Sequence, residues 1–221
     1  MKLTSIARAR AAAMRSTLFK EFLSSIAPPV RIIDLGGTVS MWERWGLSAD
    51  DRLRIDLANN FSMDVNNKDN LSKSSNISKV TVDVTTLTTS DYQRYDVIFS
   101  NSMLEHLADF EQQRSVAREI VESRRPYFIQ VPNKYCLVDP HFAHPLAPFY
   151  AAWPRSFQTR MLRISGLNGG ARARSHAQAE HRLKFYYPLS KSDMSSLFSD
   201  AEVLVERNFG MSMSIVALRR S

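Results

Sequence analysis

The sequence predicts an α/β fold in which a mainly parallel sheet carries helices on both faces and closes with an antiparallel hairpin. The chain has 221 residues, of which 44% are apolar, enough to bury the core of one substantial domain. Short apolar runs typical of strands alternate with helical or loop segments, which favours parallel pairing. The last two runs have only Arg207 to Met211 between them, too short a gap for a crossover helix, so they must pair antiparallel.

The N-terminal segment, residues 1–29, predicts a helix that packs against the domain. Its apolar residues recur near helical spacing at Ile6, Met14, Leu18, Phe22 and Ile26. It has no unbroken apolar core followed by a cleavage pattern, so we do not expect a secretory leader. A basic amphipathic helix resting on anionic lipid is the alternative, because Arg8, Arg15 and Lys20 lie mostly off the apolar stripe.

The remaining elements follow from apolar periodicity and from the polar, glycine or proline residues that bound each run. In chain order we expect a strand at residues 30–35, a short helix at 41–46, a strand at 53–57 ending near Asn59-Asn60, an exposed polar loop at 62–78, a strand through Val80, Val82 and Val84, a strand at 95–100, a helix at 110–121, a strand at 127–131 stopped by Pro132, and a closing hairpin at 202–206 and 212–218.

These elements predict a single domain, residues 1–221, with four parts. They are the N-terminal helix (1–29), a cofactor-binding core (30–144), a helical insertion or lid (145–187), and a closing helix and hairpin (188–221). The net charge of +7 permits an anionic partner. The single cysteine, Cys136, excludes a disulfide-built secreted scaffold, and no run approaches the ~20 apolar residues that span a bilayer, so we expect a cytoplasmic protein.

The end of the first predicted strand is a candidate ligand site, since open α/β sheets bind ligands at the carboxyl ends of their strands. It lacks the Gly-x-Gly-x-x-Gly turn that places a pyrophosphate on a helix N-terminus. Gly36 and Gly37 permit close backbone approach, and Asp34 supplies an acid beside them. That combination suits S-adenosylmethionine, which has an ammonium group and no phosphate. A plain strand-to-helix turn is the alternative.

Three segments together resemble the class I S-adenosylmethionine-dependent methyltransferases, which have a Rossmann-like fold. They are Ile33 to Thr38, Val82 to Leu87, and Tyr95 to Leu107, in the expected order and at fitting separations. Gln130 to Tyr135 and Asp139 to Phe142 further resemble a bacterial branch that carries Gln-Thr-Pro-Asn and then Glu-Pro-His-Phe. The resemblance covers about residues 30–145 well and the closing hairpin loosely.

The resemblance implies a set of cofactor-binding residues. Asp34, Gly36 and Gly37 would border the methionine part, Asn59 or Asn60 would hold the ribose in place of a missing acid with Asp56 as the alternative, Asp83 and Val84 would bind the adenine, and Ser100, Asn101 and Ser102 would line the strand end. The sequence departs from the family at the third glycine, where Val39 or Ser40 stands.

Methyl transfer needs alignment and removal of a proton from the acceptor. His106 is the candidate base because it follows the fourth strand, and Glu105 would orient it or contact the acceptor; a histidine packed structurally beneath the loop is the alternative. His141 is a candidate acceptor-binding residue. His141 and His144 beside Asp139 lack a convincing third ligand, so we predict no metal.

Residues 145–187 combine aromatic side chains with arginines, and this part is expected to select the acceptor. It could stack bases, bind a small anion, contact a membrane surface, or form a lid with core aromatics and solvated arginines. We expect a small-molecule, saccharide or lipid-linked acceptor, with oxygen slightly favoured. An Asn/Asp-Pro-Pro-Tyr/Phe motif for base N-methylation is missing. An RNA methyltransferase and a non-catalytic module that keeps the fold are the alternatives.

Overall fold

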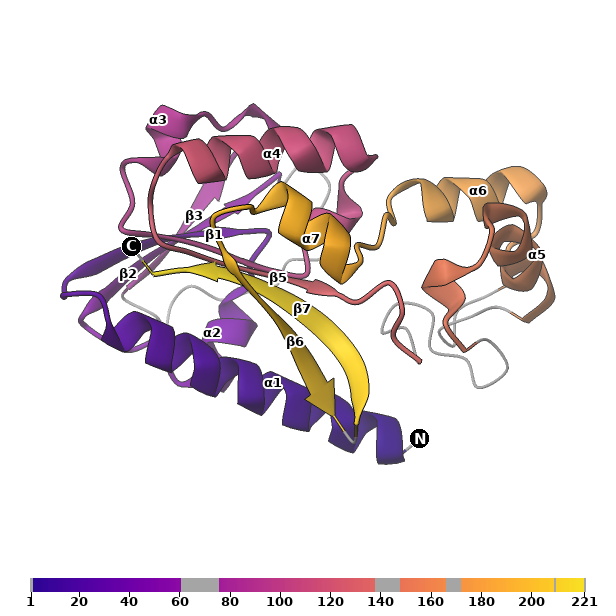
Figure 1. The fold of residues 1–221 in the computed structure, drawn as a ribbon, viewed down its shortest axis with the longest axis horizontal. Helices are drawn as coiled ribbons and strands as arrows, with labels where there is room; N and C mark the ends of the chain where they lie inside the picture. The colour runs from indigo at the N-terminus through magenta and orange to yellow at the C-terminus, as the bar shows by residue number, and fades with distance from the viewer. Residues whose placement is uncertain (1, 61–75, 138–147, 166–171, 209, 221) are drawn as a thin grey trace.

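The structure is a computed structural model that describes residues 2–60, 76–137, 148–165, 172–208 and 210–220. Its centre is a seven-stranded sheet with the order β3-β2-β1-β4-β5-β7-β6 (Figure 1). The strands are β1 (Val30–Leu35), β2 (Leu53–Asn59), β3 (Ile77–Thr81), β4 (Val97–Asn101), β5 (Tyr127–Pro132), β6 (Glu202–Asn208) and β7 (Met211–Arg219).

Strand pairing confirms the predicted sheet. The pairs β1–β2, β1–β4, β2–β3 and β4–β5 are parallel. Strand β7 pairs antiparallel with both β5 and β6, so the closing hairpin inserts its last strand beside β5. From β1 the chain adds β2 and β3 on one side, and from β4 it adds β5 on the other side. The switch point therefore lies between β1 and β4, and such sheets bind ligands at the carboxyl ends of the strands there.

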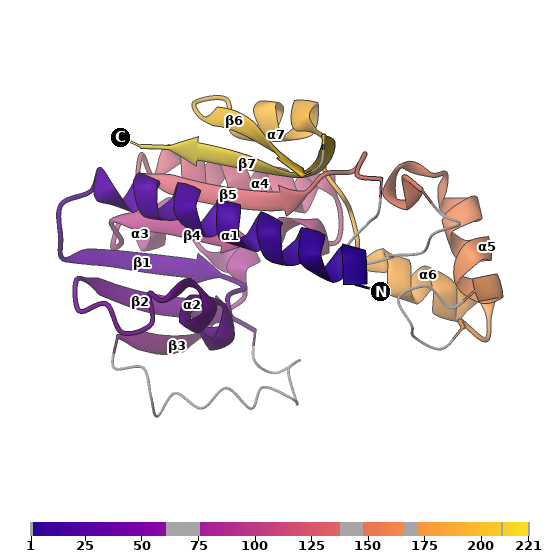
Figure 2. The same ribbon diagram turned by 90° about the horizontal axis from the view of Figure 1, so that it is seen from below.

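Helices cover both faces of the sheet, as predicted. Figure 2 shows α1 (Lys2–Ser24) and α2 (Val39–Trp45) on one face, and α4 (Phe110–Glu122) and α7 (Lys191–Leu197) on the other. The short helix α3 (Thr89–Tyr92) packs beside α4. Each face has its own buried apolar cluster, which is the packing that two helix layers on one sheet require.

The N-terminal segment packs on the domain as predicted, through Phe22 with Leu18 and Ile26, but the predicted stripe omitted Phe19. Phe19 and Phe22 are fully buried, and the Phe19 ring lies 4.6 Å from that of Phe99 and 5.2 Å from that of Phe128. Met14 is exposed. The sheet surface beneath the helix is aromatic, so it selects the face that presents two phenylalanines. The sequence alone did not show which side of the apolar stripe would meet it.

The third strand lies earlier than predicted. Strand β3 ends at Thr81, and Val84 begins a 3₁₀ turn, η3 (Val84–Thr86), instead of continuing the strand. The Asp83 side chain caps this turn by accepting from the Thr85 amide, which explains why the chain leaves the extended conformation. Asn76, placed in the predicted loop, is buried and donates to the Leu47 and Asp50 carbonyls.

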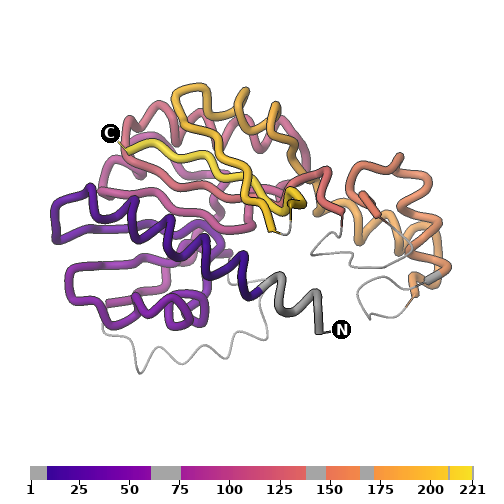
Figure 3. The backbone as a smooth tube through the Cα atoms, turned by 60° about the horizontal axis from the view of Figure 1, so that its bottom comes forward, coloured from indigo at the N-terminus to yellow at the C-terminus, as the bar shows by residue number. Residues whose placement is uncertain are grey.

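A separate lobe follows β5 at the carboxyl edge of the sheet (Figure 3). It contains η5 (Tyr150–Ala152), α5 (Arg155–Ser165) and α6 (His176–Lys184), held by a small apolar cluster that includes Tyr150, Leu162 and Leu183. Of its aromatic side chains Tyr150 is buried in this cluster, whereas Phe149 and Phe157 are exposed, so the aromatic residues are only partly core. Among the described residues, no helix is both long and apolar enough to cross a membrane.

Candidate functional site

The turn after β1 accepts only glycine at two successive positions. Gly36 has φ +78°, and a Cβ there would lie 2.6 Å from Cγ of Met103. A Cβ on Gly37 would lie 1.7 Å from Oδ2 of Asp34. The backbone of this turn therefore stays bare, with the side chains of Asp34 and Met103 filling the space that a Cβ would need.

Asp34 is fully buried beneath the turn. The Trp42 indole donates to its Oδ2 at 2.7 Å, and among the described residues Oδ1 has no hydrogen-bond partner. Burial raises the pKa of this carboxyl to about 7, since desolvation penalises the charged form more than the Trp42 bond stabilises it. The site thus contains an acceptor oxygen with unused capacity, close to the Gly37 backbone.

The residues predicted to hold a ribose have different surroundings. Asn59, at the end of β2, donates from Nδ2 to the Gly37 carbonyl at 2.9 Å, so it fixes the glycine turn. Asn60 follows it and is exposed. Asp56 lies within β2 and bonds Arg31 and the Tyr95 hydroxyl, each at 3.0 Å. The two asparagines, and not Asp56, therefore lie at the strand end.

Asp83 and Val84 lie at the turn that follows β3. Oδ1 of Asp83 accepts from the Thr85 amide at 2.9 Å and from the Thr85 hydroxyl at 2.7 Å. These bonds lower the pKa of Asp83, so its carboxylate stays charged near neutral pH. Both bonds fall on Oδ1. Val84 is buried in the apolar cluster, so any contact it makes with a polar ligand would use its backbone.

The end of β4 is tied to its neighbours by polar side chains. Ser100 is buried and donates to the Leu35 carbonyl at 3.3 Å. Asn101 accepts at Oδ1 from Arg15 at 2.6 Å. Ser102 has φ +61°, and its hydroxyl lies 3.1 Å from Oε1 of Gln130 on β5. Only Asn101 and Ser102 of this predicted set are partly exposed at the sheet edge.

Arg15 is a site residue that sequence reasoning missed. It reaches from α1 to Glu206 through two nitrogens, the closest contact being 2.7 Å, and to Ser214 at 3.0 Å. Both charged side chains are largely buried, with 13% and 9% of their surface exposed. Arg15 lies four and seven residues before Phe19 and Phe22, so helical spacing places it on the buried face. That spacing was the available signal.

The two candidate catalytic residues lie in η4 (Leu104–His106), just after β4. Glu105 is fully buried, and its carbonyl accepts from the Tyr187 amide at 2.6 Å. The side chain of His106 is 45% exposed; its Nδ1 lies 3.1 Å from the Phe185 carbonyl and its Nε2 lies 4.0 Å from Oε1 of Glu105. Both residues therefore contact the segment that returns from the lobe. His141, with Asp139 and His144, lies outside the described residues.

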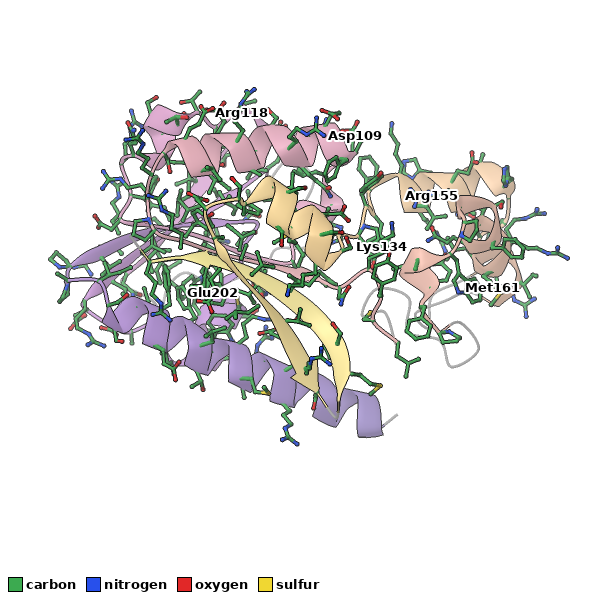
Figure 4. The ribbon with its side chains drawn as sticks, viewed as in Figure 1. Asp109, Arg118, Lys134, Arg155, Met161 and Glu202 are labelled. Carbon is green, nitrogen blue, oxygen red and sulfur yellow. The ribbon has the colours of Figure 1, made fainter. Side chains whose placement is uncertain are left out.

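A pocket of about 520 Å³ lies between the lobe and the core. Lys134, just after β5, and Arg155, at the start of α5, both line it and are labelled in Figure 4; Trp153, Tyr187 and Ala108 also line it. Arg155 bonds the Tyr186 and Leu183 carbonyls, and burial lowers the pKa of its guanidinium. Across the described residues, no three His, Cys, Asp or Glu side chains are grouped closely enough to hold a metal.

Comparison with solved structures places this architecture. The CurJ carbon methyltransferase matches with a TM-score of 0.56 and 12% identity, over 94% of the present chain and 53% of its own length. The N-methyltransferase NodS from Bradyrhizobium japonicum, solved with S-adenosylhomocysteine, matches with a TM-score of 0.52 and 13% identity. The match covers 93% of the present chain and 84% of NodS. The fold is that of the class I methyltransferases. The mitomycin 7-O-methyltransferase MmcR matches with a TM-score of 0.50 and 15% identity, over 87% of the present chain and 49% of its own length.

These class I methyltransferase structures define the fold of the chain and not its acceptor, because they include O-, N- and C-methyltransferases at 12–15% identity. The chain spans about half the length of CurJ and MmcR. No protein-family profile and no curated protein matches the sequence. In this class I fold, the Gly36-Gly37 turn, Asn59, Asp83 and Asn101 all follow or end strands at the same edge of the sheet.

Proposed function

We propose that the protein is an S-adenosylmethionine-dependent methyltransferase for a small-molecule, saccharide or lipid-linked acceptor, with oxygen favoured as the acceptor atom. The observation that carries the proposal is the bare turn of Gly36 and Gly37 above the buried Asp34, at the switch point of a class I methyltransferase fold. Because the Asp34 and Met103 side chains pack where Cβ atoms would lie, the two glycines hold this turn tightly at the edge of the sheet where such folds bind ligands.

The described residues fit the amino-acid end of this cofactor. Oδ1 of Asp34 has unused acceptor capacity among the described residues, and a nearby ammonium group would favour the charged form of this carboxyl. Asn59 holds the Gly37 carbonyl through a hydrogen bond from its Nδ2. Asp34 would then act mainly by electrostatics through the turn, because its side chain is fully buried.

The adenine and ribose would follow the same edge. Asp83 keeps a charged carboxylate with Oδ2 outside its own capping bonds, which suits an exocyclic amino donor, while the Val84 backbone would face the ring. Asn60 is exposed beside Asn59 and offers a carbonyl oxygen to the ribose hydroxyls. An amide accepts these bonds without charge, so we expect weaker ribose binding than an acid would give.

His106 is the proposed base for an oxygen acceptor. The Phe185 carbonyl can only accept, so the contact at 3.1 Å places the proton of the neutral ring on Nδ1 and leaves the lone pair on Nε2. Oε1 of Glu105, 4.0 Å from Nε2, would stabilise the imidazolium formed when that atom takes the acceptor proton. When bound, the cofactor supplies an electrophilic methyl group on its sulfonium.

Titration calorimetry with S-adenosylmethionine and S-adenosylhomocysteine tests the proposal on the full chain. Asp83→Asn is the informative variant: its amide oxygen can still cap η3, so the fold is kept while the acceptor charge is lost. We expect its affinity to fall on the order of tenfold. Arg118→Gln, on the exposed face of α4, is the control and should bind as the unmodified protein does. Absence of any heat at millimolar cofactor would contradict the proposal and favour a non-catalytic module.

The acceptor requires a separate measurement. Methyl incorporation from labelled cofactor into fractionated metabolites, lipids and RNA distinguishes the acceptor classes. Label in a saccharide, lipid-linked or other small-molecule fraction supports the proposal, and label confined to RNA would favour the RNA methyltransferase instead. The basic composition of residues 145–187, with seven Lys and Arg and a single acid, is the observation that keeps RNA as the second candidate.

A further inference from the structure

Large exposed apolar side chains are concentrated in one part of the molecule. Among the described residues, Met14 is the only such side chain outside positions 135–187. The others are Tyr135, Phe149, Phe157, Ile164, Phe185 and Tyr187. Single exposed apolar residues are ordinary on protein surfaces, whereas several on one face of a helix indicate an interaction surface.

Helix α5 shows this most clearly because it has two apolar faces. Its inner face buries Leu162 in the apolar cluster of the lobe, together with the side chains of Gln158 and Thr159. Phe157 and Ile164, seven residues apart, lie on the opposite face with 58% and 54% of their surface exposed. The fold of the lobe therefore does not account for these two side chains.

Basic residues accompany the exposed apolar ones. Arg160 and Arg163 are exposed on the outer side of α5, between Phe157 and Ile164 in the sequence. At the end of α6, the Lys184 ammonium lies 5.8 Å from the centre of the exposed Phe185 ring. Most of the net charge of the chain comes from this part, since residues 145–187 contain seven Lys and Arg and one acid.

We propose that the lobe binds the surface of an anionic lipid bilayer through α5. Phe157 and Ile164 would enter the boundary between headgroups and acyl chains, and Arg160 and Arg163 would contact the anionic headgroups. Long basic side chains suit this position because their stems lie along apolar surface while the charge stays at the interface.

The chemistry of α5 favours a bilayer over RNA. Bases stack on aromatic rings, and one of the two exposed apolar side chains of α5 is the aliphatic Ile164, which offers no π-face. A protein partner would not by itself account for the excess of positive charge, whereas anionic headgroups do. The proposal does not depend on methyl transfer. If the lobe binds a bilayer, the pocket between the lobe and the core lies near the membrane surface.

Vesicle sedimentation of the full chain tests the proposal without cofactor. We expect binding to phosphatidylcholine vesicles that contain phosphatidylglycerol, little binding to phosphatidylcholine alone, and a loss of binding as salt is raised. The Phe157→Ser/Ile164→Ser and Arg160→Gln/Arg163→Gln variants should each lower the bound fraction on the order of tenfold. All four side chains are exposed, so these variants should keep the thermal transition of the parent chain.

A matched pair of arginines on the core is the control. Arg114→Gln/Arg118→Gln removes the same charge from the exposed face of α4 and should leave vesicle binding nearly unchanged. Equal loss in this control would show that net charge alone drives binding and would overturn the assignment to α5. Failure of the parent chain to bind anionic vesicles would overturn it as well, and tight binding to an RNA homopolymer in place of vesicles would assign the lobe to nucleic acid. Calorimetry with the cofactor separates these outcomes from failure of the proposed activity.

Discussion

Asp34 is fully buried, and among the described residues its one hydrogen-bond donor is the Trp42 indole. In the unfolded chain its carboxyl ionises near its ordinary pKa of 3.8, whereas burial raises the folded pKa to about 7. The folded state therefore holds the proton more tightly. The stability that this group contributes is present at low pH and is lost as pH rises through about 7.

The first prediction follows from this sign. Asp34→Asn keeps an acceptor for Trp42 but cannot ionise. Ionisation of Asp34 lowers the free energy of unfolding as pH rises from about 4 to 7, and we expect this decrease to be absent in the variant. The full pKa difference corresponds to at most about 4 kcal/mol. Urea unfolding across this pH range measures the effect, with the exposed Asp51→Asn as control. An unchanged pH slope would contradict it.

Gly37 gives a second prediction at the residue scale. Gly37→Ala should lower the free energy of unfolding by about 1–3 kcal/mol because the new Cβ meets the Asp34 carboxylate. The same change should cost less in an Asp34→Ala background, which removes the clash. Gly46→Ala is the matched comparison: it has φ +69° and open space, so only backbone strain applies there. Equal costs with and without Asp34 would argue against the steric cause.

A third prediction concerns His106 and rests on the proposed function. His106→Gln should lower kcat about 10²–10⁴-fold, as loss of a general base does, while cofactor affinity stays within about twofold. The split arises because the base acts on the acceptor proton, and His106 is held by Glu105 and the Phe185 carbonyl. Single-turnover assays and calorimetry measure the two quantities. Unchanged turnover would leave His106 with the structural role of supporting the returning segment.

At the scale of elements, α1 connects strands that are distant in sequence. Arg15 bonds Asn101 at the end of β4, Glu206 on β6 and Ser214 on β7, across separations of 86, 191 and 199 residues. Glu206 also accepts from the Ser214 hydroxyl. The helix thus fixes the closing hairpin and the candidate cofactor edge through one guanidinium.

A fourth prediction tests this connection. Arg15→Met should lower the free energy of unfolding by about 3–5 kcal/mol, because Glu206 would be left largely buried without its cation. Arg15→Met/Glu206→Gln should recover a large part of that loss. Urea unfolding of both variants and of Glu206→Gln completes the cycle. Additive losses would mean that the two side chains are not energetically coupled.

For the whole molecule, ligand binding should be visible in the unfolding equilibrium. A cofactor that binds only the folded chain adds about 2.7 kcal/mol at a concentration of 100 times Kd. We therefore expect Tm to rise with S-adenosylhomocysteine, and the Asp83→Asn variant to need a higher concentration for the same rise. A thermal scan across cofactor concentrations measures this fifth prediction. A flat Tm would contradict cofactor binding by the folded protein.

From sequence alone we could predict most strands along the chain, their mainly parallel pairing, the antiparallel closing hairpin and the glycine turn after the first strand. The spatial order of the strands came from the structure. The predicted features depend on local periodicity and short connections, which can be read from the residue types and their spacing. The end of β3 and the anchor Phe19 were missed, because the side-chain cap at Asp83 and the aromatic sheet surface override periodicity. The roles of the site residues remain predictions.

Only the tertiary structure decided the burial of Asp34, the partners of Arg15 and the exposure of Phe157 and Ile164. Periodicity indicates that one face of an element is apolar. It does not show which element covers that face, or which polar groups far apart in the sequence lie close together in the fold. Those outcomes depend on how the helices pack on the sheet. Local periodicity is therefore enough to predict most of the sheet. The acceptor and the proposed membrane surface depend instead on the lobe, and no described residue covers the outer face of α5.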